Sequence, residues 1–317
     1  QTYLQTYAWS FFPAALSGMA ETLLCCMEAA VFPLIASITS LCINTGLNYL
    51  LIFGHGGLPA LGVQGAAVAS VAAQVVACLL VYLFLAVRLR QKQWRLRFML
   101  GFTRPELFTY AKILLPLLAS EFLWSLGENV YSAIYGNIGT QACAAMTMTT
   151  PIQCLMVGAL SGLSKAAILI GKSLGTQEYD RAYRDAQRLM RCGLATSLVL
   201  SALLLAFGRL YTTIYRVEPE VRATAYLLLV VFAVISPVKV QNMILGGGIL
   251  KSGGKTNYTL AIDLIGTWGF GVPLGLLAAF VLKLPIVPVY FLLSLEECVR
   301  LALSLRLFKK RSWMQQL

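Results

Sequence analysis

Two glutamates, a tryptophan and two tyrosines recur at heptad spacing in the segment SEFLWSLGENVYSAIYGNIG, residues 120–139. Glu121, Trp124, Glu128, Tyr131 and Tyr135 fall on one face of an α-helix, here called the 121–135 stripe. Carboxylates attract cations, and aromatic rings bind cationic ligands that have left water. The stripe therefore indicates a helix face that holds a cation. The alternative is that its aromatic residues mark a membrane interface, which suits Tyr135 better than the interior Trp124.

Further ionisable side chains interrupt later apolar runs, namely Lys239, Asp263, Glu296 and Glu297. A charge at the centre of a membrane costs about 3 kcal/mol on insertion scales, so these side chains should face a water-filled cavity or one another. Lys239 is expected to neutralise Glu121 or Asp263. A structural ion pair that orients helices is the alternative. The predicted cavity comprises Glu121, Trp124, Glu128, Tyr131, Lys239, Asp263, Glu296 and Glu297.

The elements that must position these residues are membrane-spanning helices. Hydrophobic residues make up 58% of the 317-residue chain, charged residues make up 12%, and the mean hydropathy is +0.75. A soluble protein is about a quarter charged, and recurring apolar runs of about 18 residues or more indicate spanning helices. The chain is predicted to be an all-α polytopic membrane protein. Its nine expected spans are 4–27, 31–53, 62–87, 108–136, 140–170, 193–214, 223–249, 256–281 and 285–306.

Basic residues predict the orientation of these spans. Seventeen Lys and Arg residues flank one side and four flank the other, so the rich side is expected to be cytoplasmic. Gln1 is then outside and the C-terminus is cytoplasmic, in a multi-pass protein of the cell membrane. Because the charges lie in short loops beside spans, the net charge of +12 indicates topology and argues against nucleic acid as a partner.

The spans group into two lobes. Spans one to three and spans seven to nine both end in a basic segment and both contain a Pro/Gly-marked turn, a repetition typical of secondary transporters. The expected organisation is a partial N-terminal lobe at 1–87, a basic cytoplasmic linker at 88–107, a six-span C-terminal lobe at 108–308 and a cytoplasmic tail at 309–317. The outside start with nine spans predicts that an odd number of helices is missing upstream.

Motifs for chemistry other than transport are not found in the sequence. The eight cysteines lie in or beside spans without a CxxC pair, and the lone His55 lies in a glycine-rich turn. Walker, nucleophile-elbow and metal signatures are absent. The protein is therefore expected not to be an enzyme, to carry no cofactor and no metal beyond possible Na⁺, and to be monomeric in the lipid bilayer.

Four stretches carry a resemblance to the multidrug and toxic compound extrusion (MATE) transporters. INTGLNYLLIFGHGGLPALGVQGAAVAS (43–70) looks like their fifth and sixth helices, and IYGNIGTQACAA (134–145) is similar to the end of their seventh. GLSKAAILIGKSLGTQEYDRA (162–182) and GGGILKSGGKTN (246–257) resemble the end of their eighth helix and their tenth-to-eleventh turn. The resemblance implies twelve helices in two lobes forming an inverted V, of which this chain lacks the first three. It also implies export of organic cations or drugs in exchange for H⁺ or Na⁺.

The resemblance further implies a coupling-ion site in the early lobe. The matching polar positions are Asn44, Asn48 and Ser70, whereas the acidic residue that such transporters carry on their first helix has no counterpart here. Hydrogen bonding between helices is the alternative role for these three residues. Two other function classes stay open. One is a lipid-linked precursor flippase, against which an excess of cavity carboxylates argues, and the other is a membrane protein that transports nothing.

Overall fold

In the part of the chain that it describes, the computed structural model consists of helices joined by short turns and loops, and it divides into two compact units. These units are Gln1–Gly101 and Phe102–Leu317. The predicted linker at 88–107 falls largely on residues outside the description. The described residues are 2–55, 59–91, 104–254, 256–311 and 313–314.

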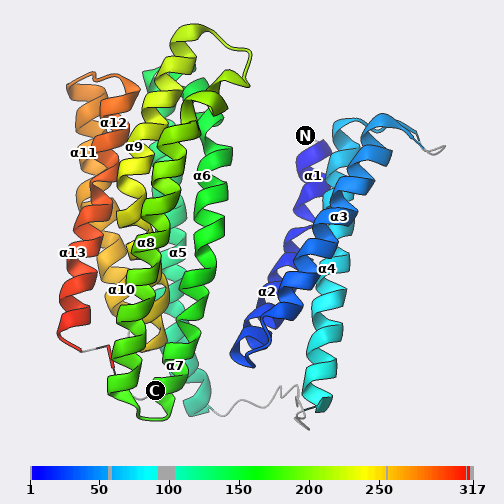
Figure 1. The fold of residues 1–317 in the computed structure, drawn as a ribbon, viewed down its shortest axis with the longest axis vertical. Coiled ribbons are helices and arrows are strands. Elements are labelled where there is room, and N and C mark those ends of the chain that lie inside the picture. Colours follow the sequence, from blue (N-terminus) through cyan, green and yellow to red (C-terminus); the bar gives the residue numbers. More distant parts are fainter. Residues whose placement is uncertain (1, 56–58, 92–103, 255, 312, 315–317) are drawn as a thin grey trace. The chain divides into compact units, whose positions relative to one another are not determined.

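Unit 1 holds the first three predicted spans (Figure 1). The span predicted at 4–27 is two helices, because Ser10 closes a tight turn through its backbone N–H and its hydroxyl, both donated to the Tyr7 carbonyl. Pro13 follows in the first helical turn, where the missing N–H is tolerated. The helices are α1 (Thr2–Ala8), α2 (Phe11–Cys26), α3 (Val31–Phe53) and α4 (Val63–Gln91).

Close packing of α3 against α4 organises unit 1. Gly54 ends α3 with a φ of 73°, a left-handed conformation that glycine adopts without a Cβ penalty. Gly65 lies against the backbone of Leu51, where a side chain would collide. Val81 and Leu85 of α4 pack with α2 in the buried core of the unit. Small residues at the α3–α4 contact therefore allow the two helices to approach closely.

Unit 2 holds the remaining six predicted spans as one helical bundle (Figure 1). Three of its segments have the wider turn of a π-helix and are labelled η. Its elements are α5 (Arg104–Ile138), α6 (Thr140–Ala166), α7 (Ile168–Gly175), α8 (Tyr179–Thr213), α9 (Pro219–Ile244), η1 (Leu245–Leu250), α10 (Thr256–Asp263), η2 (Leu264–Gly271), α11 (Val272–Leu276), η3 (Leu277–Val281), α12 (Ile286–Ser294) and α13 (Glu296–Lys309).

The helices confirm an all-α polytopic membrane protein. Within the described residues, six helical stretches are long and apolar enough to cross a membrane. The other three predicted spans are also helical: the first is divided between α1 and α2, the last divides at Leu295, and α5 carries two glutamates in its middle. The six stretches are Val31–Phe53, Val63–Gln91, Thr140–Gly175, Tyr179–Thr213, Pro219–Leu250 and Thr256–Val281.

Small side chains bring α8 against α9 at the centre of unit 2. Gly193, Ser197 and Ser201 follow one another at four-residue spacing on the buried face of α8. The Ser201 hydroxyl lies 2.7 Å from the hydroxyl of Ser236 on α9, so the two helices share a buried hydrogen bond. In lipid, where hydrophobic burial drives no helix association, such close packing and polar contacts hold helices together.

The segment after α13 folds back onto unit 2, a feature called here the C-terminal clasp (Tyr183, Phe308, Arg311, Trp313). Phe308 stacks on Trp313 at 5.7 Å and on Tyr183 of α8 at 5.0 Å between ring centroids. The guanidinium of Arg311 lies 4.4 Å from the Tyr183 ring centroid. Trp313 is only 1% exposed and its backbone abuts Gly253, a position with no room for a side chain. Trp313, in the segment predicted as a cytoplasmic tail (309–317), is therefore buried in the core of unit 2.

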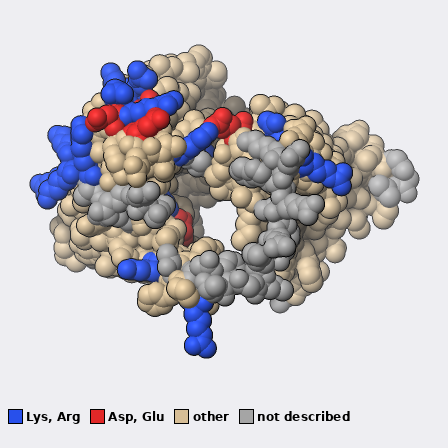
Figure 2. All heavy atoms as spheres, turned by 90° about the horizontal axis from the view of Figure 1, so that it is seen from below, with Lys and Arg blue, Asp and Glu red and all other residues tan. Residues whose placement is uncertain are grey.

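Basic side chains gather at the end of unit 2 where α8 begins and α13 ends. Figure 2 views this end and shows Lys and Arg crowded along its rim, with some acidic neighbours among them. Arg181, for example, lies 2.9 Å from Glu178. The exposed residues here include Lys172, Arg181, Arg184, Arg188, Arg191, Arg306, Lys309, Lys310 and Arg311.

Candidate functional site

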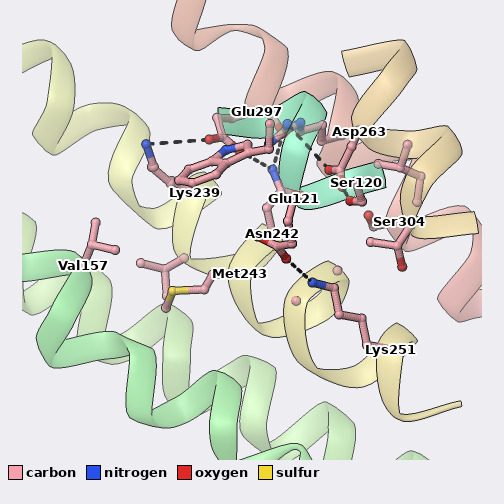
Figure 3. A pocket seen from close by; sticks show the side chains of 17 residues that line it. Ser120, Glu121, Val157, Lys239, Asn242, Met243, Lys251, Asp263, Glu297 and Ser304 are labelled. Atoms are coloured by element: carbon pink, nitrogen blue, oxygen red, sulfur yellow. Dashed lines mark hydrogen bonds and ion pairs between the residues drawn. The ribbon is translucent and has the colours of Figure 1, made fainter. Parts of the chain in front are cut away.

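A cavity of about 330 Å³ opens between the helices of unit 2 (Figure 3). Its walls come from α5, α6, α9, η1, α10 and α13, together with Lys251 at the end of η1. It combines apolar surface with a few charged groups, the usual composition of a small-molecule site. The lining residues are Ser120, Glu121, Trp124, Val157, Lys239, Val240, Asn242, Met243, Gly246, Gly247, Lys251, Thr259, Ile262, Asp263, Glu297, Arg300 and Ser304.

Every carboxylate among these lining residues is paired with a basic side chain. The pairing differs from the prediction that Lys239 neutralises Glu121 or Asp263, which is wrong. A sequence places ionisable residues on helices but does not give the rotation of each helix against its neighbours. The three ion pairs are Glu121–Lys251 at 2.9 Å, Asp263–Arg300 at 3.6 Å and Glu297–Lys239 at 3.9 Å.

Asp263 and Arg300 form the most enclosed of the three pairs. Their side chains are 20% and 9% exposed, respectively. Arg300 also donates a hydrogen bond to Thr267 Oγ1 at 2.6 Å, and Asp263 accepts one from the Ser120 hydroxyl. Asp263 is the last residue of α10 and Thr267 lies in η2, so the wider π turn begins at this site. Such π segments occur frequently at functional sites.

Glu297 is held more firmly than its partner Lys239. Its carboxylate accepts a hydrogen bond of 2.8 Å from Asn242 Nδ2, and its side chain is 10% exposed. The side chain of Lys239 is 39% exposed, and its ammonium lies 3.9 Å from Glu297, beyond hydrogen-bond distance. In Figure 3, Lys239 extends along one wall toward Glu297. Lys239 is therefore the less constrained partner.

Glu121 and Lys251 form the most open pair, with side chains 63% and 28% exposed. Lys251 follows η1 and is one of the seventeen basic residues that the sequence predicts to flank the cytoplasmic side. Trp124, one helical turn from Glu121, is 45% exposed and presents its ring to the cavity. This part of the site thus offers a flat aromatic surface beside a charged pair.

The structure divides the 121–135 stripe into two parts. Glu121 and Trp124 line the cavity, whereas the described lining does not include Glu128, Tyr131 or Glu296. Tyr131 is buried and donates a hydrogen bond to Glu296, which joins α5 to α13. Glu128 is exposed on α5. The prediction that the 121–135 stripe lines one cavity therefore holds for Glu121 and Trp124 but not for Glu128 and Tyr131.

The charges around the cavity are balanced. The three pairs place three acidic and three basic side chains along its described lining. The expected carboxylate excess is therefore wrong for this site, because Lys251 and Arg300 were left out of the prediction. Three buried polar atoms beside it, Asn242 Oδ1, Thr259 Oγ1 and Arg300 Nε, find no hydrogen-bond partner among the described residues.

Sequence reasoning missed Arg300, which lies in the predicted span 285–306. It follows Glu296 by four residues and Glu297 by three, the spacing at which helical side chains are neighbours. That spacing was a usable signal for a polar cluster. Asn242 was missed for a different reason, because an isolated amide in an apolar helix has no distinctive pattern.

The three polar residues predicted in unit 1 lie together. Asn48 Nδ2 donates to Asn44 Oδ1 at 3.0 Å, and Asn44 Nδ2 donates to Ser70 Oγ at 3.3 Å. The chain of hydrogen bonds joins α3 to α4, as interhelical bonding requires. The Asn48 Oδ1 atom is buried with no hydrogen-bond partner among the described residues. This amide oxygen is therefore an unpaired acceptor next to the three hydrogen-bonded residues.

Comparison with known proteins assigns the chain to a family of transporters. A model of the MatE family matches residues 116–277, about half of the chain. The chain therefore belongs to the multidrug and toxic compound extrusion family, which confirms the resemblance of its sequence motifs.

Curated relatives and solved structures agree with this assignment. An uncharacterized transporter, YisQ of Bacillus subtilis, is 24% identical over 86% of this chain and 60% of its own length. A probable multidrug resistance protein, NorM of Bacillus cereus, is 28% identical over 78% of this chain and 54% of its own length. The chain thus spans little more than half of either relative.

Two solved transporters have the same fold. The bent form of VcmN, a Vibrio cholerae MATE transporter, matches 98% of this chain and 68% of its own with a TM-score of 0.80 at 18% identity. The MATE transporter ClbM, solved in complex with Rb⁺, matches 96% and 67% with a TM-score of 0.75 at 19% identity. At these identities the likeness concerns the fold alone.

Proposed function

We propose that this chain is the cavity-bearing part of a secondary active antiporter, which exports small organic cations or other drug-like molecules in exchange for H⁺ or Na⁺. The observation that carries the proposal is the cavity of unit 2, whose lining combines the carboxylates of Glu121, Asp263 and Glu297 with Trp124 in a MATE family fold. Ionisable groups inside a membrane protein usually mark a substrate or ion pathway.

The orientation and the coupling ion are parts of the same proposal. The basic end of unit 2 faces the cytoplasm, in agreement with the distribution of charge along the sequence. Asn44, Asn48 and Ser70 are proposed as ligands or positioning groups for the coupling ion, supported by the unpaired Asn48 Oδ1. A lipid-linked precursor is less well matched as cargo, because basic side chains do not outnumber acidic ones along the cavity.

Transport in inverted membrane vesicles tests the proposal. The protein, expressed from its complete reading frame, should accumulate a fluorescent organic cation such as ethidium when a proton or sodium gradient is applied. Dissipating each gradient in turn identifies the coupling ion. Asp263→Asn should abolish accumulation, whereas Glu220→Gln, on an exposed position at the start of α9, should leave it unchanged. Accumulation that persists without either gradient would contradict secondary transport.

A further inference from the structure

The three ion pairs of the cavity restrict the charge of its ligand. A cation that approaches one of these carboxylates must displace a lysine or arginine that is already there. The displaced group then lacks its counterion in a partly buried site, which is unfavourable. An anion meets the same difficulty with the opposite sign. A molecule that carries both charges avoids it, because it supplies a new partner to each member of the pair it separates.

The Glu297–Lys239 pair is the one that separates most readily. At 3.9 Å it is the longest of the three pairs, and it joins a hydrogen-bonded carboxylate to a more exposed ammonium that lies beyond hydrogen-bond distance. Glu297 keeps its hydrogen bond from Asn242 when Lys239 swings aside. The ligand's ammonium group would then bind Glu297, and its acidic group would bind Lys239.

Two other features fit a ligand of this kind. The exposed ring of Trp124 provides a stacking surface on the cavity wall. The unpaired polar atoms beside the cavity include both kinds of hydrogen-bonding group: Arg300 Nε is a donor, Asn242 Oδ1 is an acceptor, and the Thr259 hydroxyl is either.

We propose that the cavity of unit 2 binds a small aromatic zwitterion, with its basic group on Glu297, its acidic group on Lys239 and its ring on Trp124. This inference rests on the proposed transport function and specifies its substrate class. It places Lys239 as the residue that determines charge selectivity, because Lys239 competes with a simple cation for Glu297 and so makes cations bind more weakly than zwitterions.

Three indole compounds test the charge preference with the ring held constant. Tryptophan is a zwitterion, tryptamine a cation and indole-3-propionate an anion. Their relative affinities are measured by competition against tritiated tryptophan on the purified protein in detergent, or against tritiated tryptamine where tryptophan binding is lost. Wild-type protein should bind tryptophan at least tenfold more tightly than either analogue. Equal or tighter binding of tryptamine would overturn the inference.

Two cavity variants and a matched control test whether the Glu297–Lys239 pair determines the charge preference. Lys239→Met should remove the preference for tryptophan and strengthen tryptamine binding at least tenfold, because Glu297 is left free for a cation. Glu297→Gln should shift the preference toward indole-3-propionate, and it provides a second test if Lys239→Met does not fold. Lys309→Met, an exposed change on α13 outside the cavity lining, should keep the wild-type ranking. An unchanged ranking in folded Lys239→Met or Glu297→Gln protein would overturn the assignment.

The outcome separates this inference from the proposed function. Gradient-driven export of ethidium together with a preference for tryptamine over tryptophan would leave the antiporter proposal standing and remove the zwitterion. Absence of any indole binding, with export intact, would also remove it. The expected indole ranking in a protein that accumulates neither ethidium nor tritiated tryptophan under either gradient would instead support the ligand class and overturn the transport proposal.

Discussion

Replacing Arg300 by methionine should destabilise unit 2 strongly. The substitution removes the guanidinium from a pair that is 9% and 20% exposed, and takes from Asp263 the basic side chain with which it is paired while keeping its hydrogen bond from the Ser120 hydroxyl. Removing one member of a buried ion pair costs about 3–5 kcal/mol. For a domain of this size, each kcal/mol lowers the melting temperature by about 2–4 °C, so the expected decrease is about 6–20 °C.

Thermal unfolding of the detergent-purified protein, followed by intrinsic fluorescence, measures this decrease. Arg306→Met, an exposed substitution on the same helix, is the matched control and should change the melting temperature by less than about 2 °C. The double variant Arg300→Met/Asp263→Asn should recover part of the loss, because residue 263 no longer carries a charge that lacks its counterion. Wild-type stability in Arg300→Met, or a double variant as unstable as the single one, would refute the pairing.

Three further predictions concern other parts of the molecule. Trp313→Ala should cost about 3–5 kcal/mol of stability because it empties a buried site, whereas Trp9→Ala, at a position 68% exposed, should leave the detergent melting temperature nearly unchanged; equal effects would contradict the clasp. Glu121→Gln should cost less than about 1 kcal/mol in the same melting assay, since its pair with Lys251 is largely exposed; a large loss would show that this pair is structural. In a background without native cysteines, a membrane-impermeant thiol reagent added to intact cells should label cysteine at Glu220 and leave cysteine at Lys310 unlabelled, and labelling of both would refute the topology.

The spans could be predicted because lipid imposes a simple rule on sequence. A helix that crosses a membrane needs a long apolar run, and such runs are visible without knowing what each helix contacts. The interruptions within spans were harder to predict. The turn at Ser10 and the division at Leu295 depend on local backbone geometry, which the hydropathy of 4–27 and 285–306 does not report.

The sequence predicted which residues belong to the candidate site better than it predicted which of them form ion pairs. Asp263 and Glu297 stood out as charges in apolar runs, and both line the cavity. Their partners, Arg300 and Lys239, depend on how α9, α10 and α13 are rotated and spaced, which is set by packing across the whole unit. Trp313 shows the same limit, because a tryptophan in a basic segment gives no sign that it is buried.

The paired charges of the cavity also determine how strongly the membrane potential acts on it. With all six side chains ionised, three positive and three negative charges sum to zero. Carrying one elementary charge across 100 mV involves about 2.3 kcal/mol of electrical work, so an excess of either sign among these residues would make movement of the empty site voltage-dependent. In the paired arrangement these residues contribute no net charge to that movement. In the proposed transport cycle, the voltage dependence is then determined by the charges that the ligand and the coupling ion bring into the cavity.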